Sequence, residues 1–232
     1  MTQRDSAVAL IRPKTLSGYQ EMFGYIYGKV NKKYSDDALF RRLGEEISKL
    51  MEIARKDYRR DFLAQLPRIY SWWNAFASRK RIVLQEALWH KYPGVCGHCL
   101  REQNCTCGVE HPDISKEEKE SILRRLRRDH ANREPFSISD HQSLHARLYK
   151  QQNARIMPIQ IAAHVSEEWG EISEEDRHGN WSGICNEMAD VASWIFALAT
   201  RLEISVEGAV WNLYPYECEK CHKDVCECKG VV

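Results

Sequence analysis

The sequence has no long hydrophobic run and no excess of charge of either sign. Crossing a bilayer takes about 20 consecutive apolar residues, and no stretch of the 232 residues approaches that length. Residues 1–14 are too few and too polar for a signal peptide. These absences exclude a membrane partner, and we expect a cytoplasmic protein.

The charge balance excludes a general attraction to nucleic acid. The chain has 34 Lys and Arg residues against 33 Asp and Glu residues, for a formal net charge of +1. A local basic run at residues 124–128 is interpreted as a solvated helix face, with contact to nucleic acid as the alternative. Nucleic acid is therefore not an expected partner.

Signals for β-strands are nearly absent, because no segment alternates apolar and polar residues cleanly and no Asn-Gly hairpin turn occurs. Helical spacing is clear instead, and residues 184–201 carry an apolar stripe at Ile184, Met188, Val191, Ile195 and Leu198. The pattern predicts an all-α fold. In the second half we expect helices over 138–151, 157–175, 184–201 and 205–214, with a loop at 178–183.

Uncommon residues recur at a constant spacing of 122, the separation of Trp72 from Trp194. The same offset relates Trp89 to Trp211, Tyr92-Pro93 to Tyr214-Pro215, and Cys96 and Cys99 to Cys218 and Cys221. Chance would not put these pairs in one register. We predict two homologous four-helix units, 14–108 and 136–232, packed as an intrachain pseudo-dimer. A charged, helical connector, 109–135, joins them, and a further homodimer of whole chains stays open.

Acidic residues are spaced to share helix faces in the second unit. Glu167, Glu168 and Glu171 lie on one expected helix, and Glu187 and Asp190 lie on the next. Glu187 and Asp190 are the only charged residues between 184 and 200, so burying them without a cation would be costly. Carboxylates suit Mg²⁺ or Mn²⁺. A solvated acidic face is the alternative for the first three.

The two motifs together, Glu-Glu-x-x-Glu and then Glu-x-x-Asp, resemble the signature of the all-α nucleotide pyrophosphohydrolases, most closely the MazG-like branch. The resemblance covers residues 138–210 well and the first unit weakly. It implies hydrolysis of a nucleoside triphosphate to a monophosphate and pyrophosphate, with water attacking the α-phosphorus. It also implies the Mg²⁺ ligands Glu168, Glu171, Glu187 and Asp190, and the catalytic carboxylates Glu167, Glu168 and Glu171. Glu167 would hold a second ion or orient the water.

The same resemblance suggests substrate contacts upstream of the acids and in the following loop. The candidates are Lys150, Asn153, Arg155 and Trp181. Each polar residue has an alternative interpretation as ordinary surface. Trp181 could stack on a base or anchor its loop.

The first unit lacks the complete acidic set. At the 122-residue offset, Glu45 and Glu46 match Glu167 and Glu168. The positions of Glu171, Glu187 and Asp190 are instead occupied by Lys49, Gln65 and Arg68. We therefore expect one active site per chain, with the first unit as a scaffold, and we expect Pro67 to break or restart a helix. Lys49 and Arg68 would contact phosphate only if they face the functional site.

Each unit ends in four cysteines: Cys96, Cys99, Cys105 and Cys107, then Cys218, Cys221, Cys226 and Cys228. Because the cytosol keeps thiols reduced, these clusters predict two structural Zn²⁺ ions per chain. His98 or His222 could replace one thiolate in its cluster. Disulfides, free thiols and an iron–sulfur cluster are the alternatives, and Cys185 stands alone.

Two other functions stay open at this point. One is a non-catalytic protein that senses nucleotides or binds nucleic acid through its zinc knuckles. The other is a phosphoribosyl-ATP pyrophosphatase, which shares the metal-binding acids. The intact acids of the second unit favour an enzyme that hydrolyses nucleoside triphosphates.

Overall fold

The computed structural model describes residues 11–107, 114–129 and 137–229. Within these ranges the chain forms ten helices and no strand, so the predicted all-α class is confirmed. None of these helices has the length and apolar composition needed to cross a bilayer. The expectations for residues 1–10, and the unit and connector boundaries within 108–113, 130–136 and 230–232, lie outside the described residues.

The helices of the first half are α1 (Leu16–Asn31), α2 (Asp36–Lys56), α3 (Phe62–Arg79) and α4 (Leu84–Lys91). A further helix, α5 (Lys116–Asp129), follows and meets the end of α4, where Arg127 Nε donates to the carbonyl of His90 at 2.8 Å. The second half contains α6 (Ile138–Leu148), α7 (Lys150–Asn153), α8 (Pro158–Arg177), α9 (Trp181–Arg201) and α10 (Val206–Leu213).

Local sequence accounts for several helix starts. The side chains of Thr15 and Ser35 accept hydrogen bonds from the first turns of α1 and α2, as expected of N-cap residues. Ser137 and Asp140 form a reciprocal capping box at the start of α6. Pro158 occupies the first turn of α8, where its missing N–H leaves no intrahelical bond unmade.

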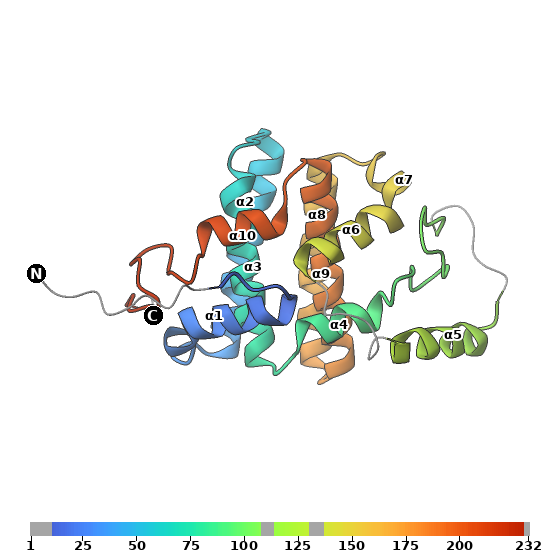
Figure 1. Cartoon of the computed structure of the whole chain (residues 1–232), viewed down its shortest axis with the longest axis horizontal. Coiled ribbons are helices and arrows are strands. Elements are labelled where there is room, and N and C mark those ends of the chain that lie inside the picture. Colours follow the sequence, from blue (N-terminus) through green and yellow to red (C-terminus); the bar gives the residue numbers. More distant parts are fainter. Residues whose placement is uncertain (1–10, 108–113, 130–136, 230–232) are drawn as a thin grey trace, which may run out of the picture.

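The longest helices, α2, α3, α8 and α9, stand together at the centre of the molecule. Helices α1, α4, α6 and α10 cross them, while α5 lies to one side (Figure 1). α2 packs against α3 and α8, while α9 packs against α8 and α3. The short helices exchange partners, because α4 packs on α9 and α10 packs on α3. Each half therefore contributes its last helix to the other half.

Matched hydrogen bonds recur 122 residues apart. The side-chain Nε2 of Gln20 donates to the carbonyl of Ile82 at 2.8 Å, and Nε2 of Gln142 donates to the carbonyl of Ile204 at 2.8 Å. These bonds tie the first helix of each half to the turn before its last helix. All five residues of the stripe predicted for 184–201 are buried, as the helical spacing indicated.

Trp169, which stands among the glutamates in the sequence, belongs to the contact between α2 and α8. Its ring stacks on Phe40 with centroids 4.9 Å apart, and its Nε1 donates to the carbonyl of Phe40 at 3.3 Å. Gly44 allows this approach, because a Cβ there would lie 2.4 Å from Trp169 Cζ2. The tryptophan joins the two halves.

Replacing Gly44 with alanine should therefore destabilise the protein by about 1–3 kcal/mol, because the rigid Trp169 ring must move. Gly24→Ala is the matched control, since a Cβ at this helical position has no heavy-atom neighbour within 4 Å. We expect this change to be neutral or stabilising. Denaturant unfolding of both variants measures the difference. Equal stabilities would contradict the close packing described here.

Three local expectations are wrong. The loop is limited to residues 178–180, because Asn180 accepts from the amide of Gly183 at 3.1 Å and starts α9 at Trp181. The helix expected over 138–151 ends at Leu148, and α7 follows. Pro67 lies inside α3 without ending it, because about one turn of helix precedes its buried ring and few backbone bonds are affected.

Candidate active site and cysteine clusters

Three of the predicted metal ligands lie together in the second half. Glu168 and Glu171 project from α8, and Glu187 projects from α9, which packs beside it. One carboxylate oxygen from each lies within 4.8 Å of the others. The spacing of three residues on α8 puts both of its glutamates on the side that faces Glu187.

The environment of these carboxylates disfavours their charged forms. Burial raises the pKa of Glu187 to about 8, because the negative charges of Asp190, Glu168 and Glu171 offset the lowering effect of Lys91. Burial and then Asp190 raise the pKa of Glu168. Acids this close to one another and partly desolvated gain stability from a bound cation.

Asp190 lines the same site but lies outside the group of three. It accepts a hydrogen bond from the hydroxyl of Tyr92 and lies 2.8 Å from the ammonium of Lys91. Burial alone would lower the pKa of Lys91, but Asp190, followed by Glu187 and Glu168, raises it. Both partners come from the end of α4, so the first half completes the site of the second.

A chain of contacts runs from Glu168 to Glu167 along the exposed side. Trp194 Nε1 donates to Glu168 Oε1 at 2.9 Å. The Trp194 ring stacks on His164 with centroids 4.2 Å apart, and His164 Nδ1 lies 2.6 Å from Glu167. Glu167 is exposed and does not belong to the group of three carboxylates.

A cavity of about 230 Å³ opens beside Glu168 and Asp190. Its wall includes Tyr92, Cys96, His98, Cys105, Cys107, Tyr149, Gln152, Asn153, Ser193 and Trp194. Asn153 is buried, and its Nδ2 has no hydrogen-bond partner among the described residues. This N–H donor is therefore available to a ligand in the cavity.

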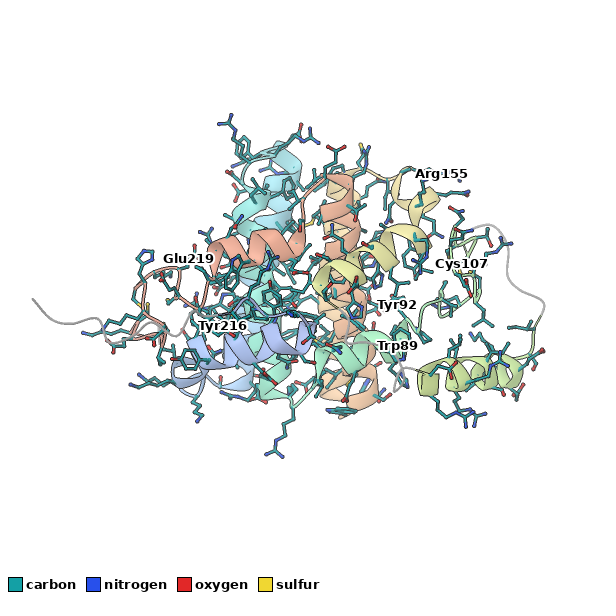
Figure 2. All side chains as sticks on the ribbon, in the orientation of Figure 1. Trp89, Tyr92, Cys107, Arg155, Tyr216 and Glu219 are labelled. Atoms are coloured by element: carbon teal, nitrogen blue, oxygen red, sulfur yellow. The ribbon has the colours of Figure 1, made fainter. Side chains whose placement is uncertain are left out.

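The other predicted substrate residues lie elsewhere. Lys150 and Arg155 are exposed and do not line the cavity. In Figure 2, Arg155 lies at the outer edge of the molecule, beyond α7. Trp181 is 57% exposed, and its Nε1 donates to the carbonyl of Lys80 at 3.4 Å. This contact favours the interpretation of Trp181 as a side chain that anchors its loop over its interpretation as a base-stacking residue.

Sequence reasoning missed Lys91 and the role of Tyr92. In the sequence, Tyr92 stands out only as part of the repeated Tyr-Pro pair. Lys91 gave no signal, because Leu213 occupies the equivalent position in the second half. Their contribution depends on the exchange of α4 between halves, which no local pattern reveals.

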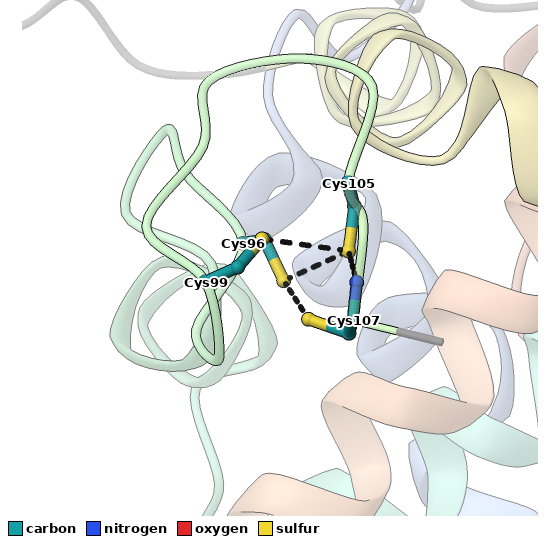
Figure 3. Close-up of side chains that lie close together, drawn as sticks. All are labelled: Cys96, Cys99, Cys105 and Cys107. Carbon is teal, nitrogen blue, oxygen red and sulfur yellow. Dashed lines mark hydrogen bonds between the residues drawn. The ribbon is translucent and has the colours of Figure 1, made fainter. Parts of the chain in front are cut away.

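The eight clustered cysteines form two groups of four. In the first, Cys105 Sγ lies 3.4 Å from Cys96 Sγ and 3.6 Å from Cys99 Sγ (Figure 3). In the second, Cys218 and Cys228 sulfurs are 3.8 Å apart. Tetrahedral zinc with Zn–S bonds of about 2.3 Å separates its sulfurs by about 3.8 Å. Both groups therefore fit Zn²⁺.

Two of the alternatives for the cysteines, a disulfide and a histidine in place of one thiolate, fit less well. All nine cysteines lie among the described residues, and all are free. The four thiols of each group converge without a histidine. His222 is exposed, and its ring lies 4.0 Å from Glu217. Backbone N–H groups of Glu227 and Lys223 lower the pKa of Cys221 to about 6, whereas burial raises the pKa of Cys226 and raises that of Cys105 to about 11. A bound cation would favour the thiolate in all of them.

Each cysteine group is attached to the opposite half of the chain. The amide of Cys105 donates to the carbonyl of Leu148 at 2.7 Å, and that of Cys226 donates to Ile26 at 2.7 Å. Leu148 ends α6, and Ile26 lies on α1. The first group thereby forms one wall of the cavity beside the acids.

Beneath this cavity, His145 should make the protein sensitive to acid. Its Nδ1 lies 3.0 Å from Ser193 Oγ, and burial, followed by the neighbouring His141, lowers its pKa to about 3. The folded state keeps His145 neutral, whereas the unfolded chain protonates it near pH 6.5. Its contribution is therefore present above pH 6.5 and is lost as the pH falls.

We expect the free energy of unfolding to fall by roughly 2–3 kcal/mol between pH 7 and pH 4.5 from this group alone. His145→Gln should flatten that part of the profile. Urea unfolding of both proteins across this pH range measures the effect. Parallel profiles would contradict a neutral, buried imidazole.

Comparisons with protein-family models, with curated proteins and with solved structures find no match for this chain.

Proposed function

We propose that the second half of the chain hydrolyses nucleoside triphosphates to monophosphates and pyrophosphate with the help of Mg²⁺. The observation that carries this proposal is the convergence of Glu168, Glu171 and Glu187 from two adjacent helices, with Glu168 also lining a cavity. The motif resemblance to the MazG-like pyrophosphohydrolases supports the same reaction.

The donor set fits the metal. Octahedral Mg²⁺ with ligand oxygens at about 2.1 Å separates those oxygens by about 3–4 Å, which is compatible with carboxylate oxygens grouped within 4.8 Å. When bound, Mg²⁺ would neutralise charge on the triphosphate as pyrophosphate leaves. Glu168, Glu171 and Glu187 would hold it, with Asp190 as the fourth ligand.

The chain's own side chains orient these ligands and the substrate. Trp194 fixes Glu168 through its indole N–H. Tyr92 and Lys91 hold Asp190 on the side of the cavity. The free N–H of Asn153 can donate to an oxygen of the nucleotide. Glu167 remains our candidate to orient water, with His164 fixing its carboxylate.

We further propose that the chain is a tandem duplication packed as a pseudo-dimer. The matched hydrogen bonds and the exchanged helices support this view. The cysteine groups would hold two structural zinc ions, each fastening the end of one half to the other half. Only the second half would be catalytic, because the first has lost three of the acids.

The test is turnover of ribo- and deoxyribonucleoside triphosphates by the zinc-loaded full chain. We expect equal amounts of monophosphate and pyrophosphate with Mg²⁺ and neither product without it. A folded chain that releases no pyrophosphate from any nucleotide would reject the enzyme. Binding without turnover would then favour the nucleotide-sensing alternative.

A further inference from the structure

The first half contains a second cavity, of about 310 Å³, at the position equivalent to the cavity beside the acids. Its wall includes Tyr27, Asn31, Ser71 and Trp72. These lie 122 residues before Tyr149, Asn153, Ser193 and Trp194, which line the other cavity. We call the two spaces the first cleft and the second cleft.

The two clefts carry opposite charge. The described part of the chain lines the second cleft with Glu168 and Asp190 and with no lysine or arginine. The first cleft is lined by five cations, Arg42, Lys49, Arg68, Lys220 and Lys229, against two carboxylates, Glu46 and Glu219. Lys49 and Arg68 occupy the positions equivalent to Glu171 and Asp190. The sign of the charge is therefore reversed at two positions that we propose bind the metal in the second half.

The two carboxylates partly organise these cations. Lys49 lies 2.7 Å from Glu46, which also accepts from Gln65 at 2.9 Å. Arg68 pairs with Glu219, which follows the first cysteine of the second group. Arg42 lies 2.6 Å from Glu45, which does not line the cleft, and Lys220 and Lys229 are exposed. A cavity with this surplus of cations attracts anions and repels divalent metals.

The aromatic side chains narrow the ligand class. Trp72 packs edge-on against Tyr34 with centroids 5.9 Å apart, and both line the first cleft. A guanidinium beside lysine ammonium groups suits phosphate oxygens. An indole ring on the same wall offers a surface on which a base can stack.

We propose that the first cleft binds the phosphate groups of a nucleotide or free polyphosphate without a metal ion. This site is additional to the hydrolase site and requires no turnover. Arg68 and Lys49 contact the phosphates, and Glu219 gives up Arg68 when the anion enters. The two sources share the phosphate chemistry, and Trp72 distinguishes them.

Titration calorimetry of the zinc-loaded full chain in magnesium-free buffer tests the proposal, with ATP and tripolyphosphate as probes. The Glu187→Gln variant should bind as the wild type does, because the acids of the second cleft are not involved. Arg68→Gln combined with Lys49→Gln should weaken binding of both probes at least tenfold. Lys32→Gln, at an exposed lysine outside the cleft, is the charge-matched control.

Two further variants keep the test independent of folding. Arg68→Lys retains the charge but loses the planar fork, and should give an intermediate affinity. Lys220→Gln with Lys229→Gln changes only exposed side chains and should also weaken binding.

Trp72→Phe should weaken the binding of ATP alone if the natural ligand is a nucleotide, and the binding of neither probe if it is a polyphosphate.

Failure of both probes to bind, or equal affinity in the wild type and in all of the cation variants, would overturn the proposal. A changed affinity in Glu187→Gln, in either direction, would assign the anion to the second cleft and would likewise overturn the proposal. These outcomes do not depend on catalysis, because an inactive chain can still bind an anion in the first cleft.

Discussion

Pyrophosphate release should fall by roughly 100-fold or more when Glu187 is replaced by glutamine, because loss of a metal ligand removes several kcal/mol of charge stabilisation. Glu187 lies within 4.8 Å of Glu168 and Glu171 and is the member contributed by α9. Glutamine keeps the side-chain size but removes the negative charge. The assay is steady-state pyrophosphate release with Mg²⁺ at saturating nucleotide.

Glu174→Gln is the matched control for this variant. Glu174 lies on α8, as Glu168 and Glu171 do, but it is exposed and lines neither cleft. It should retain wild-type release. Circular dichroism must show that both variants are folded, and Glu187→Gln should be at least as stable as the wild type without Mg²⁺ because a crowded acid is gone. Undiminished release by folded Glu187→Gln would remove Glu187 from the site.

Loss of a zinc ligand should have the second large effect. Structural zinc contributes on the order of 10 kcal/mol to folding, so Cys105→Ser should lower the melting temperature by roughly 10 °C or more. Cys105 also anchors the end of α6 through Leu148 and lines the second cleft. This variant should therefore lose pyrophosphate release along with stability.

The second cysteine group supplies the control. Cys226→Ser removes the equivalent ligand from the second cysteine group, which lines the first cleft. It should lose stability to a similar degree but affect release less at a temperature where both variants stay folded. Cys185→Ser, outside both groups, should change the melting temperature little. Differential scanning fluorimetry measures the melting temperatures of all three variants.

Zinc content provides the direct check. Elemental analysis should give two zinc ions per wild-type chain and one in each cluster variant. A wild-type chain that folds and melts identically without bound metal would contradict the structural role of these clusters.

Sequence patterns anticipated the helical class because helix periodicity is a local property. The stripe from Ile184 to Leu198 indicated which face of α9 is buried, and that face is buried. The spacing of the acids indicated that four carboxylates, including Asp190, would meet. The oxygens of Glu168, Glu171 and Glu187 do lie close together, but Asp190 is not in that group. Both inferences needed only the pitch of a helix and the packing of neighbours.

Features that depend on the exchange of helices between halves were not predictable. Lys91 meets Asp190 only because α4 packs on α9. Trp181 is a different case, because the local cap by Asn180 starts α9 there although the composition of residues 178–183 predicts a loop. The charge reversal in the first cleft was visible at Lys49 and Arg68, but Lys220 and Lys229 join them only in three dimensions.

Turnover in ¹⁸O-labelled water tests the proposed chemistry most directly. With Mg²⁺ and the preferred nucleotide, mass spectrometry should find one labelled oxygen in the nucleoside monophosphate and none in the pyrophosphate, because water attacks the α-phosphorus. Label in pyrophosphate, release of orthophosphate instead, or no turnover of any nucleotide would contradict a pyrophosphohydrolase site built on Glu168, Glu171 and Glu187.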